Sequence, residues 1–139
     1  MKKLYTAVMT ASGGRSGIVK SPDGKYEYAL SMPKELRGEG GDGVNPELLF
    51  AAGYSACFHS AMKVVATRRK VEIEGSSVTA SVDIGMISGG GFGLAVTLNV
   101  RIPGMEKAVA EELVAAAHLV CPYSNATRNN IEVTLVVES

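Results

Sequence analysis

Two cysteines, Cys57 and Cys121, are the residues of this chain whose type and placement point most directly to chemistry. Cys57 lies near the middle of one apolar stretch, and Cys121 lies at the end of another. A buried free cysteine is commonly a small hydrophobic residue without reactivity. Alternatively, the two form a reactive pair, in which one thiolate attacks an electrophile and the other resolves the oxidised product into a disulfide. The residues alone leave both interpretations open.

A reactive cysteine needs a neighbour that stabilises its thiolate, because a free thiol has a pKa of about 8.5. Arg15 carries a permanent positive charge and lies between glycines in the segment GGRSG. A carboxylate such as Glu47 could hold that guanidinium in place. The other interpretation is an ordinary glycine turn with a solvated arginine.

The two histidines suggest a metal site, which the spacing argues against. Cys57 and His59 stand at positions i and i+2 of a predicted helix, about 200° apart around its axis. They therefore cannot bind one ion together, and His59 cannot act as general base for Cys57. His118 and Cys121 could converge, but two ligands do not make a structural site. We predict no metal and treat both histidines as packing residues.

One long helix is predicted from residue 46 to about residue 70. Asn45 is a favourable N-cap, Pro46 suits the first helical position, and Glu47 complements the positive end of the helix dipole. Residues 48–62 contain no Asp, Glu, Lys or Arg and are apolar or small on every face. Such a helix is expected in a core.

The remaining patterns predict two groups of strands and a second helix. Alternating apolar residues and turn signals indicate the elements. We expect strands over 2–9, 18–19, 26–31, 78–86, 92–102 and 131–137, and a helix over 106–120. The order βββ–α–ββ–α–β predicts an α+β fold with antiparallel sheets around two core helices. We expect residues 1–139 to form a single domain.

Composition limits the possible partners and the location. Fourteen basic and fourteen acidic residues balance, so nothing favours binding to nucleic acid. Residues 48–62 are too short and too rich in Ser, Gly and Ala for a confident membrane span. The N-terminus does not resemble a signal peptide. Two cysteines without such a signal favour the reducing cytoplasm, with no membrane association.

Three segments resemble the signatures of one family. NPELLFAAGYSACF, VCPYSNATRNNI and GGRSG are similar to the conserved segments of the organic hydroperoxide resistance (Ohr) family, within the OsmC/Ohr superfamily. The resemblance covers nearly the whole chain. It implies an intertwined homodimer with two sites at its interface. It also implies a thiol peroxidase that reduces organic hydroperoxides, fatty-acid hydroperoxides included. No cofactor would be bound, and dihydrolipoamide-bearing proteins would supply the reducing dithiol.

The resemblance also assigns roles by position. Cys57 resembles the peroxidatic cysteine, which becomes a sulfenic acid, and Cys121 resembles the resolving cysteine, which closes an intramolecular disulfide with it. Arg15 and Glu47 resemble the pair that polarises the reactive thiolate. Leu48 and Ser16 depart from common family residues but occupy no catalytic position. An apolar surround would favour apolar organic hydroperoxides. The candidate substrate contacts are Phe50, Tyr54, Phe58 and Met62. Each of them could equally be an ordinary core residue.

Glu47 and Cys57 are expected to serve one site from two subunits. In a straight helix, ten residues span roughly 15 Å, and the two side chains point about 80° apart. A carboxylate cannot cover that distance. We therefore expect each Glu47 to act in the partner subunit's site, across a twofold axis.

Two alternative functions remain open at this stage. One is an OsmC-type peroxidase with a different substrate preference, although the compact length and the VCPYSN segment favour the Ohr branch. The other is a non-catalytic dimeric ligand-binding domain with inert cysteines.

Overall fold

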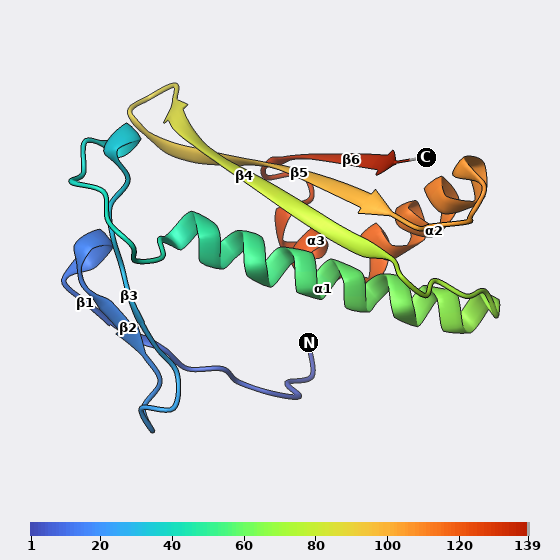
Figure 1. Cartoon of the computed structure of the whole chain (residues 1–139), viewed down its shortest axis with the longest axis horizontal. Helices are drawn as coiled ribbons and strands as arrows, with labels where there is room; N and C mark the ends of the chain where they lie inside the picture. Colours follow the sequence, from blue (N-terminus) through green and yellow to red (C-terminus); the bar gives the residue numbers. More distant parts are fainter. Residues whose placement is uncertain (139) are drawn as a thin grey trace. The chain divides into compact units, whose positions relative to one another are not determined.

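The computed structural model describes residues 1–138 and divides into two compact units, Met1–Leu49 and Phe50–Ser139. Each unit has its own three-stranded sheet, so the fold is α+β as predicted. The prediction that residues 1–139 form one domain stays a prediction. Figure 1 shows the elements in the order in which the chain forms them.

The N-terminal unit is an antiparallel meander of short strands, in the order β1-β2-β3. The predicted meander is confirmed, but the strand expected over 2–9 is wrong, because pairing begins only at Thr10. An alternating pattern gives a strand only where a neighbouring segment takes up its backbone hydrogen bonds. The elements are β1 (Thr10–Ser12), the 3-10 helix η1 (Gly14–Ser16), β2 (Ile18–Lys20), β3 (Glu27–Ala29) and the 3-10 helix η2 (Lys34–Leu36).

The C-terminal unit contains the larger sheet, in the order β4-β5-β6. Its strands are β4 (Ser77–Ile87), β5 (Gly91–Arg101) and β6 (Glu132–Glu138). β4 and β5 form a long antiparallel hairpin, in which Ser77 pairs with Arg101 and Ile87 with Gly91. Gly89 and Gly90 make its turn with φ values of 92° and 82°, which side chains other than glycine rarely adopt.

The expectation of purely antiparallel sheets is wrong for this second sheet. β6 pairs with β5 in parallel, with Val96 opposite Val133 and Val100 opposite Val137. Helices α2 (Lys107–Val120) and α3 (Pro122–Thr127) lie between these two strands in the chain. A helical crossover returns the chain to the same end of the sheet, which makes a parallel pair possible.

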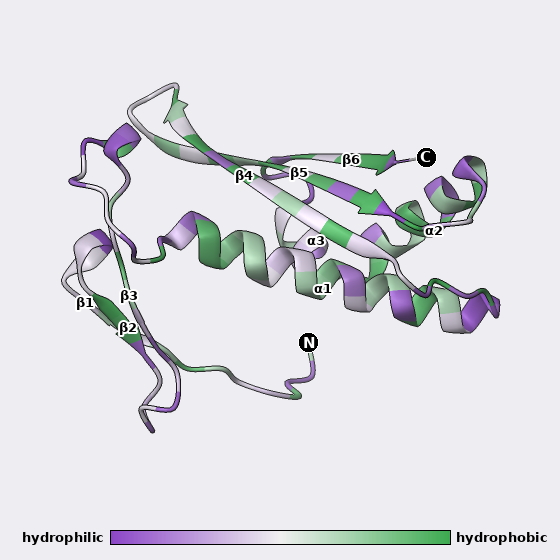
Figure 2. Ribbon diagram, in the orientation of Figure 1, coloured by the Kyte–Doolittle hydropathy of each residue, from purple (hydrophilic) through white to green (hydrophobic). Residues whose placement is uncertain are grey.

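Helix α1 (Pro46–Arg69) begins and ends as its sequence predicts. The Asn45 side-chain oxygen accepts a hydrogen bond from the Leu48 amide at 2.8 Å, which is an N-cap. Lys70 follows the helix with a φ of 57°, and the Val71 amide bonds back to the Ala66 carbonyl, as at many helix ends. Figure 2 shows hydrophilic residues at both ends of α1.

The core of the C-terminal unit lies where α1 and α2 pack on β5. The buried residues of α1 recur every three or four positions, which places them on one face. The main buried side chains are Tyr54, Phe58, Met62, Val65, Val96, Leu98, Val100, Leu113, Val114 and Cys121.

The expected burial of α1 on every face is wrong for the single chain. Leu48 and Val64 are 54% and 40% exposed. By length and composition alone α1 could cross a membrane, but core helices of soluble proteins share these features. The packing of its inner face in the C-terminal core accounts for the apolar residues of that face.

Candidate active site

The two cysteines meet inside the C-terminal unit. Cys57, in the middle of α1, is half-buried, and Cys121, just after α2, is fully buried. The Cys121 thiol donates a hydrogen bond to the Cys57 sulfur, with the two sulfur atoms 3.4 Å apart. A disulfide has an S–S distance of about 2.05 Å. A movement of about 1.4 Å would therefore join the two sulfurs within one chain.

The surroundings of Cys57 within the C-terminal unit disfavour its thiolate. Burial is the largest influence and raises the pKa of Cys57 above its ordinary value, and the Cys121 thiol raises it further. A backbone hydrogen bond from Tyr123 acts in the opposite direction and lowers this pKa. The short distance between the sulfurs thus favours a reaction between the thiols, whereas forming the Cys57 thiolate near neutral pH requires an added positive charge nearby.

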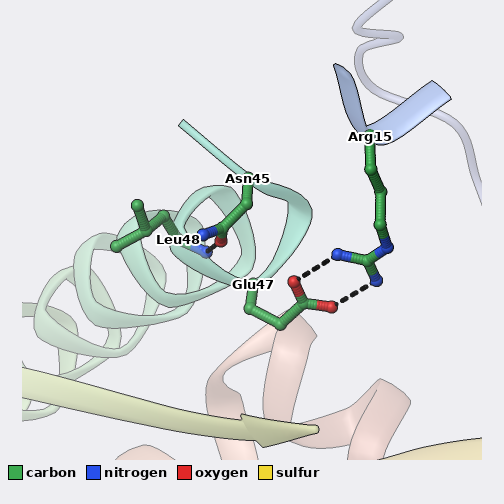
Figure 3. Close-up of polar contacts among 4 residues, drawn as sticks. All are labelled: Arg15, Asn45, Glu47 and Leu48. Carbon is green, nitrogen blue, oxygen red and sulfur yellow. Dashed lines mark hydrogen bonds and ion pairs between the residues drawn. The ribbon is translucent and has the colours of Figure 1, made fainter. Parts of the chain in front are cut away.

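Arg15 and Glu47 form an ion pair in the N-terminal unit. The two terminal guanidinium nitrogens donate to the two carboxylate oxygens, each at 2.7 Å (Figure 3). The hydrogen bond from Arg15 is the main cause that lowers the pKa of Glu47, and the same bond raises the pKa of Arg15. A bidentate pair of this kind fixes both position and orientation of the guanidinium. The solvated turn considered for Arg15 is therefore not what the structure shows.

Glycines shape the turn that carries Arg15. Gly13 and Gly14 have φ values of 80° and 60°, in the left-handed region. A side chain at Gly17 would place its Cβ 1.8 Å from the Ser12 carbonyl oxygen. The GGRSG spacing is thus needed to fold η1 tightly and to aim Arg15 at Glu47.

An apolar cavity of about 550 Å³ is lined by Phe50 of α1 and by the segment that follows Cys121. Its walls include Phe50, Leu94, Tyr123 and Ile131. Tyr123 belongs to both features, because its backbone bonds to the Cys57 sulfur and its ring lines the cavity. Gly53 leaves room for that ring, since a Cβ there would lie 2.6 Å from the Tyr123 hydroxyl.

Of the four predicted substrate contacts, Phe50 lines this cavity. Tyr54, Phe58 and Met62 have no exposed surface and lie in the core. That all four contact a substrate stays a prediction.

Sequence reasoning missed a row of polar groups, three buried and one half-buried, which we call the hydroxyl chain: Ser124, Tyr54 and Thr127, with the half-buried His118. The Tyr54 hydroxyl is 2.9 Å from Ser124 Oγ and 3.1 Å from Thr127 Oγ1. His118 Nδ1 lies 2.8 Å from Ser124 Oγ. The available signal was the spacing of Ser124 and Thr127, because three residues place the two hydroxyl side chains one turn apart on α3.

The histidines have separate roles in packing. His59 Nε2 hydrogen-bonds Ser76 Oγ at 2.9 Å and not a cysteine. In residues 1–138, no three His, Cys, Asp or Glu side chains gather as metal ligands would.

Comparison with known proteins identifies the family. The model of the OsmC family, described as "OsmC-like protein", matches residues 38–136 of this chain. This chain belongs to the OsmC-like family. The match covers helix α1, strands β4 and β5, most of β6 and both cysteines.

Within the OsmC-like family, the chain is similar in sequence and in structure to organic hydroperoxide resistance (Ohr) proteins. It is 56% identical over 137 residues to the organic hydroperoxide resistance protein of Xanthomonas axonopodis pv. citri, covering 98% of this chain and 96% of that protein. It is 46% identical to OhrB of Bacillus subtilis, covering 95% of this chain and 96% of OhrB. The crystal structure of an organic hydroperoxide resistance protein from Elizabethkingia anophelis superimposes with a TM-score of 0.94 at 53% identity, covering 100% of this chain and 99% of that one. The predicted placement in the Ohr branch of the OsmC/Ohr superfamily is confirmed.

Proposed function

We propose that this chain is a cysteine-based thiol peroxidase that reduces organic hydroperoxides, fatty-acid hydroperoxides among them, to alcohols. The names of its relatives support a role in hydroperoxide resistance. The observation that carries the proposal is the 3.4 Å distance between the sulfurs of Cys57 and Cys121. Cysteines that act only as small core hydrophobes are expected to be buried and need not contact each other, whereas here the sulfurs are in contact and Cys57 is partly exposed.

The reaction proceeds in two steps. The Cys57 thiolate attacks the terminal oxygen of the hydroperoxide, so that an S–O bond forms, the O–O bond breaks and the alkoxide leaves as the alcohol after taking a proton. Cys57 is then a sulfenic acid. Cys121 attacks the Cys57 sulfur, the S–O bond breaks, and the disulfide and one water molecule are the products.

Arg15 supplies the charge that the first step needs. Its guanidinium stays protonated at all working pH values and has five N–H donors. Set beside Cys57, it lowers the pKa of the thiol and stabilises the departing alkoxide. Glu47 orients the guanidinium through the bidentate pair. We propose that the Arg15–Glu47 pair serves the Cys57 of the partner subunit, because Glu47 is too far along the helix from the Cys57 of its own chain. The homodimer itself is what the family resemblance implies.

The apolar cavity binds the organic part of the substrate. Phe50 and Leu94 offer it apolar surface, and Tyr123 links the cavity to Cys57. Burial of methylene groups there stabilises the complex by about 0.8 kcal/mol each, a gain that hydrogen peroxide cannot make. Tyr54, Phe58 and Met62 complete the apolar surround from within the core.

The disulfide is recycled by an external dithiol, which we propose to be the lipoyl group of a partner protein. The enzyme holds no cofactor of its own and works in the cytoplasm as a homodimer. The exposed apolar side of α1, with Leu48 and Val64, supports the dimer, because such a surface is stabilised when a second subunit covers it.

One observation favours an alternative. Burial raises the pKa of Cys57, as it would for an inert cysteine in a non-catalytic dimeric ligand-binding domain. An OsmC-type peroxidase with another substrate preference is a further alternative within the same chemistry.

Thiol counting separates these functions. Reduced protein is mixed with one equivalent of a tertiary-alkyl hydroperoxide, and free thiols are then titrated. The proposed enzyme loses two thiols per chain, and both return on adding dihydrolipoamide. Retention of both thiols would establish the non-catalytic alternative. Comparison of the rates for tertiary-alkyl hydroperoxide and hydrogen peroxide distinguishes the two peroxidase types.

A further inference from the structure

In each hydrogen bond of the hydroxyl chain, the donor can be identified by counting the protons that each group carries. The Thr127 hydroxyl donates to the Ser124 carbonyl oxygen at 3.2 Å, and a carbonyl can only accept. Thr127 has no second proton, so the Tyr54 hydroxyl must donate to Thr127 Oγ1.

The same count continues to the histidine. Because the Tyr54 proton is used on Thr127, Ser124 must donate to the Tyr54 oxygen. Ser124 then has no proton left for His118, and therefore Nδ1 of His118 must carry the hydrogen. His118 is thus in its Nδ1–H tautomer, and Nε2 has the free lone pair.

The hydroxyl chain connects the helices that carry the two cysteines. Tyr54 lies one turn before Cys57 on α1, and His118 lies one turn before Cys121 on α2. Ser124 lies three residues after Cys121, on α3. The chain of hydrogen bonds therefore spans the α2–α3 junction, where Cys121 is located, and ties it to α1 one turn before Cys57. Figure 1 shows where these three helices lie in the fold.

Burial makes this arrangement stiff. Tyr54 and Ser124 have no exposed surface, and Thr127 is 4% exposed. A buried hydroxyl that loses its partner costs more than a hydrogen bond gains, so each member holds the others in place. Arg128 adds a further tie, because it donates to the His118 carbonyl oxygen and to Asn125 Oδ1.

We propose that the hydroxyl chain positions Cys121 for attack on the Cys57 sulfenic acid and fixes His118 in the Nδ1–H tautomer. Its members are positioning residues, since none of them supplies an atom to the reaction. The positioning half rests on the proposed function, whereas the tautomer does not. Burial and the charge of Arg128 lower the pKa of His118, which supports a neutral ring. If Cys121 is displaced, the sulfenic acid lives longer and a second hydroperoxide oxidises it to the sulfinic acid.

The tautomer is tested by nitrogen-15 NMR of the imidazole. In the reduced wild-type protein above the His118 pKa, Nδ1 should show a protonated, pyrrole-type shift and Nε2 an unprotonated one. Tyr54→Phe removes the acceptor of the Ser124 proton, so Ser124 can donate to Nδ1 and the ring should shift to the Nε2–H tautomer. Tyr26→Phe makes the same chemical change at a 52% exposed tyrosine and should leave the spectrum unchanged. An Nε2–H ring in the wild type would overturn the proton count.

Positioning is tested by the products of oxidation. After treatment with excess tertiary-alkyl hydroperoxide, mass spectrometry gives the ratio of Cys57 sulfinic acid to disulfide. Tyr54→Phe should raise this ratio about tenfold. Losing one net hydrogen bond that holds Cys121 in place should slow its attack on the sulfenic acid by about that factor. A general loss of stability, followed in parallel by thermal unfolding, would not change the ratio unless Cys121 moved.

Rescue by a conservative change completes the test. His118→Asn keeps an N–H donor near the Nδ1 position and should retain the wild-type ratio, whereas His118→Leu should behave as Tyr54→Phe does. An unchanged ratio in both Tyr54→Phe and His118→Leu would overturn the positioning role while leaving the peroxidase function intact. Failure of the wild-type protein to oxidise Cys57 at all would overturn the function and the positioning role together, but not the tautomer.

Discussion

Oxidation should make this protein more stable, by an amount that the position of its thiols allows us to work out. Cys57 and Cys121 are 64 residues apart in sequence, and their sulfurs need to approach by about 1.4 Å to bond. A cross-link that closes a loop of this size removes about 4 kcal/mol of chain entropy from the unfolded state. Because the thiols already touch in the folded state, little of this gain should be lost to distortion.

Thermal unfolding of the reduced and the peroxide-treated protein measures this gain. The loop entropy corresponds to a rise in Tm on the order of 10 °C. Protein concentration must be equal in both samples, since association also shifts Tm. Cys121→Ser is the matched control, because it can be oxidised at Cys57 but cannot close the loop. Non-reducing electrophoresis should show that the oxidised chain remains a monomer band.

Two results would refute the reasoning. An unchanged or lower Tm in fully oxidised protein would mean that closing the gap distorts the packing of α1 against α2 by as much as the loop entropy contributes. A dominant covalent dimer on the gel would mean that the sulfurs react between subunits and not across the 3.4 Å contact.

The remaining predictions concern the site residues one by one. Cys57→Ser should abolish turnover, and Cys121→Ser should allow one oxidation per chain and then stall; multiple turnovers of Cys121→Ser with a dithiol would reverse the roles. Arg15→Ala should keep the fold, raise the pKa of Cys57 measured by thiolate absorbance, and slow the attack on an organic hydroperoxide by about 100-fold; an unchanged rate would remove Arg15 from the site. The folded-state pKa of Glu47 lies below its ordinary value of 4.5, so its pairing stabilises the protein above that pH and the gain is lost as pH falls toward the lowered pKa; acid titration of Glu47→Gln should lack this loss. Co-refolding Glu47→Ala with Cys57→Ser chains should restore activity if Glu47 acts in trans, and heterodimers without activity would show that it does not.

The sequence predicted helix α1 well because its signals are local. Asn45 accepts from the Leu48 amide as an N-cap should, and the helix ends one residue before the predicted Lys70. The pairing of Arg15 with Glu47 was also anticipated, because the family resemblance assigns both residues to one site. The helix inference needs only nearby residues, whereas the ion pair joins residues 32 apart and was anticipated through the resemblance.

Features that depend on distant parts of the chain were not predictable in the same way. The alternation in β6 shows which face is buried but not whether the strand runs parallel or antiparallel to β5. The Tyr54–Ser124 bond joins residues 70 apart, and neither residue type signals a partner. The pattern over residues 2–9 predicts a strand, yet a strand also needs a neighbour, which periodicity does not supply.

The two steps of the proposed reaction place different demands on the protein. The second step needs only proximity, and the contact between Cys57 and Cys121 already provides it. The first step needs charge, and burial works against it by raising the pKa of Cys57. Arg15 should therefore set the rates of both hydroperoxide attacks, on the thiolate and on the sulfenic acid, without affecting the attack by Cys121. The hydroxyl chain should do the reverse, because it holds Cys121 and carries no charge to the attacking sulfur. Substitutions in the two groups should accordingly be independent. The double variant Arg15→Ala with Tyr54→Phe should show the slow attack of Arg15→Ala and a sulfinic ratio changed by the product of the two single effects.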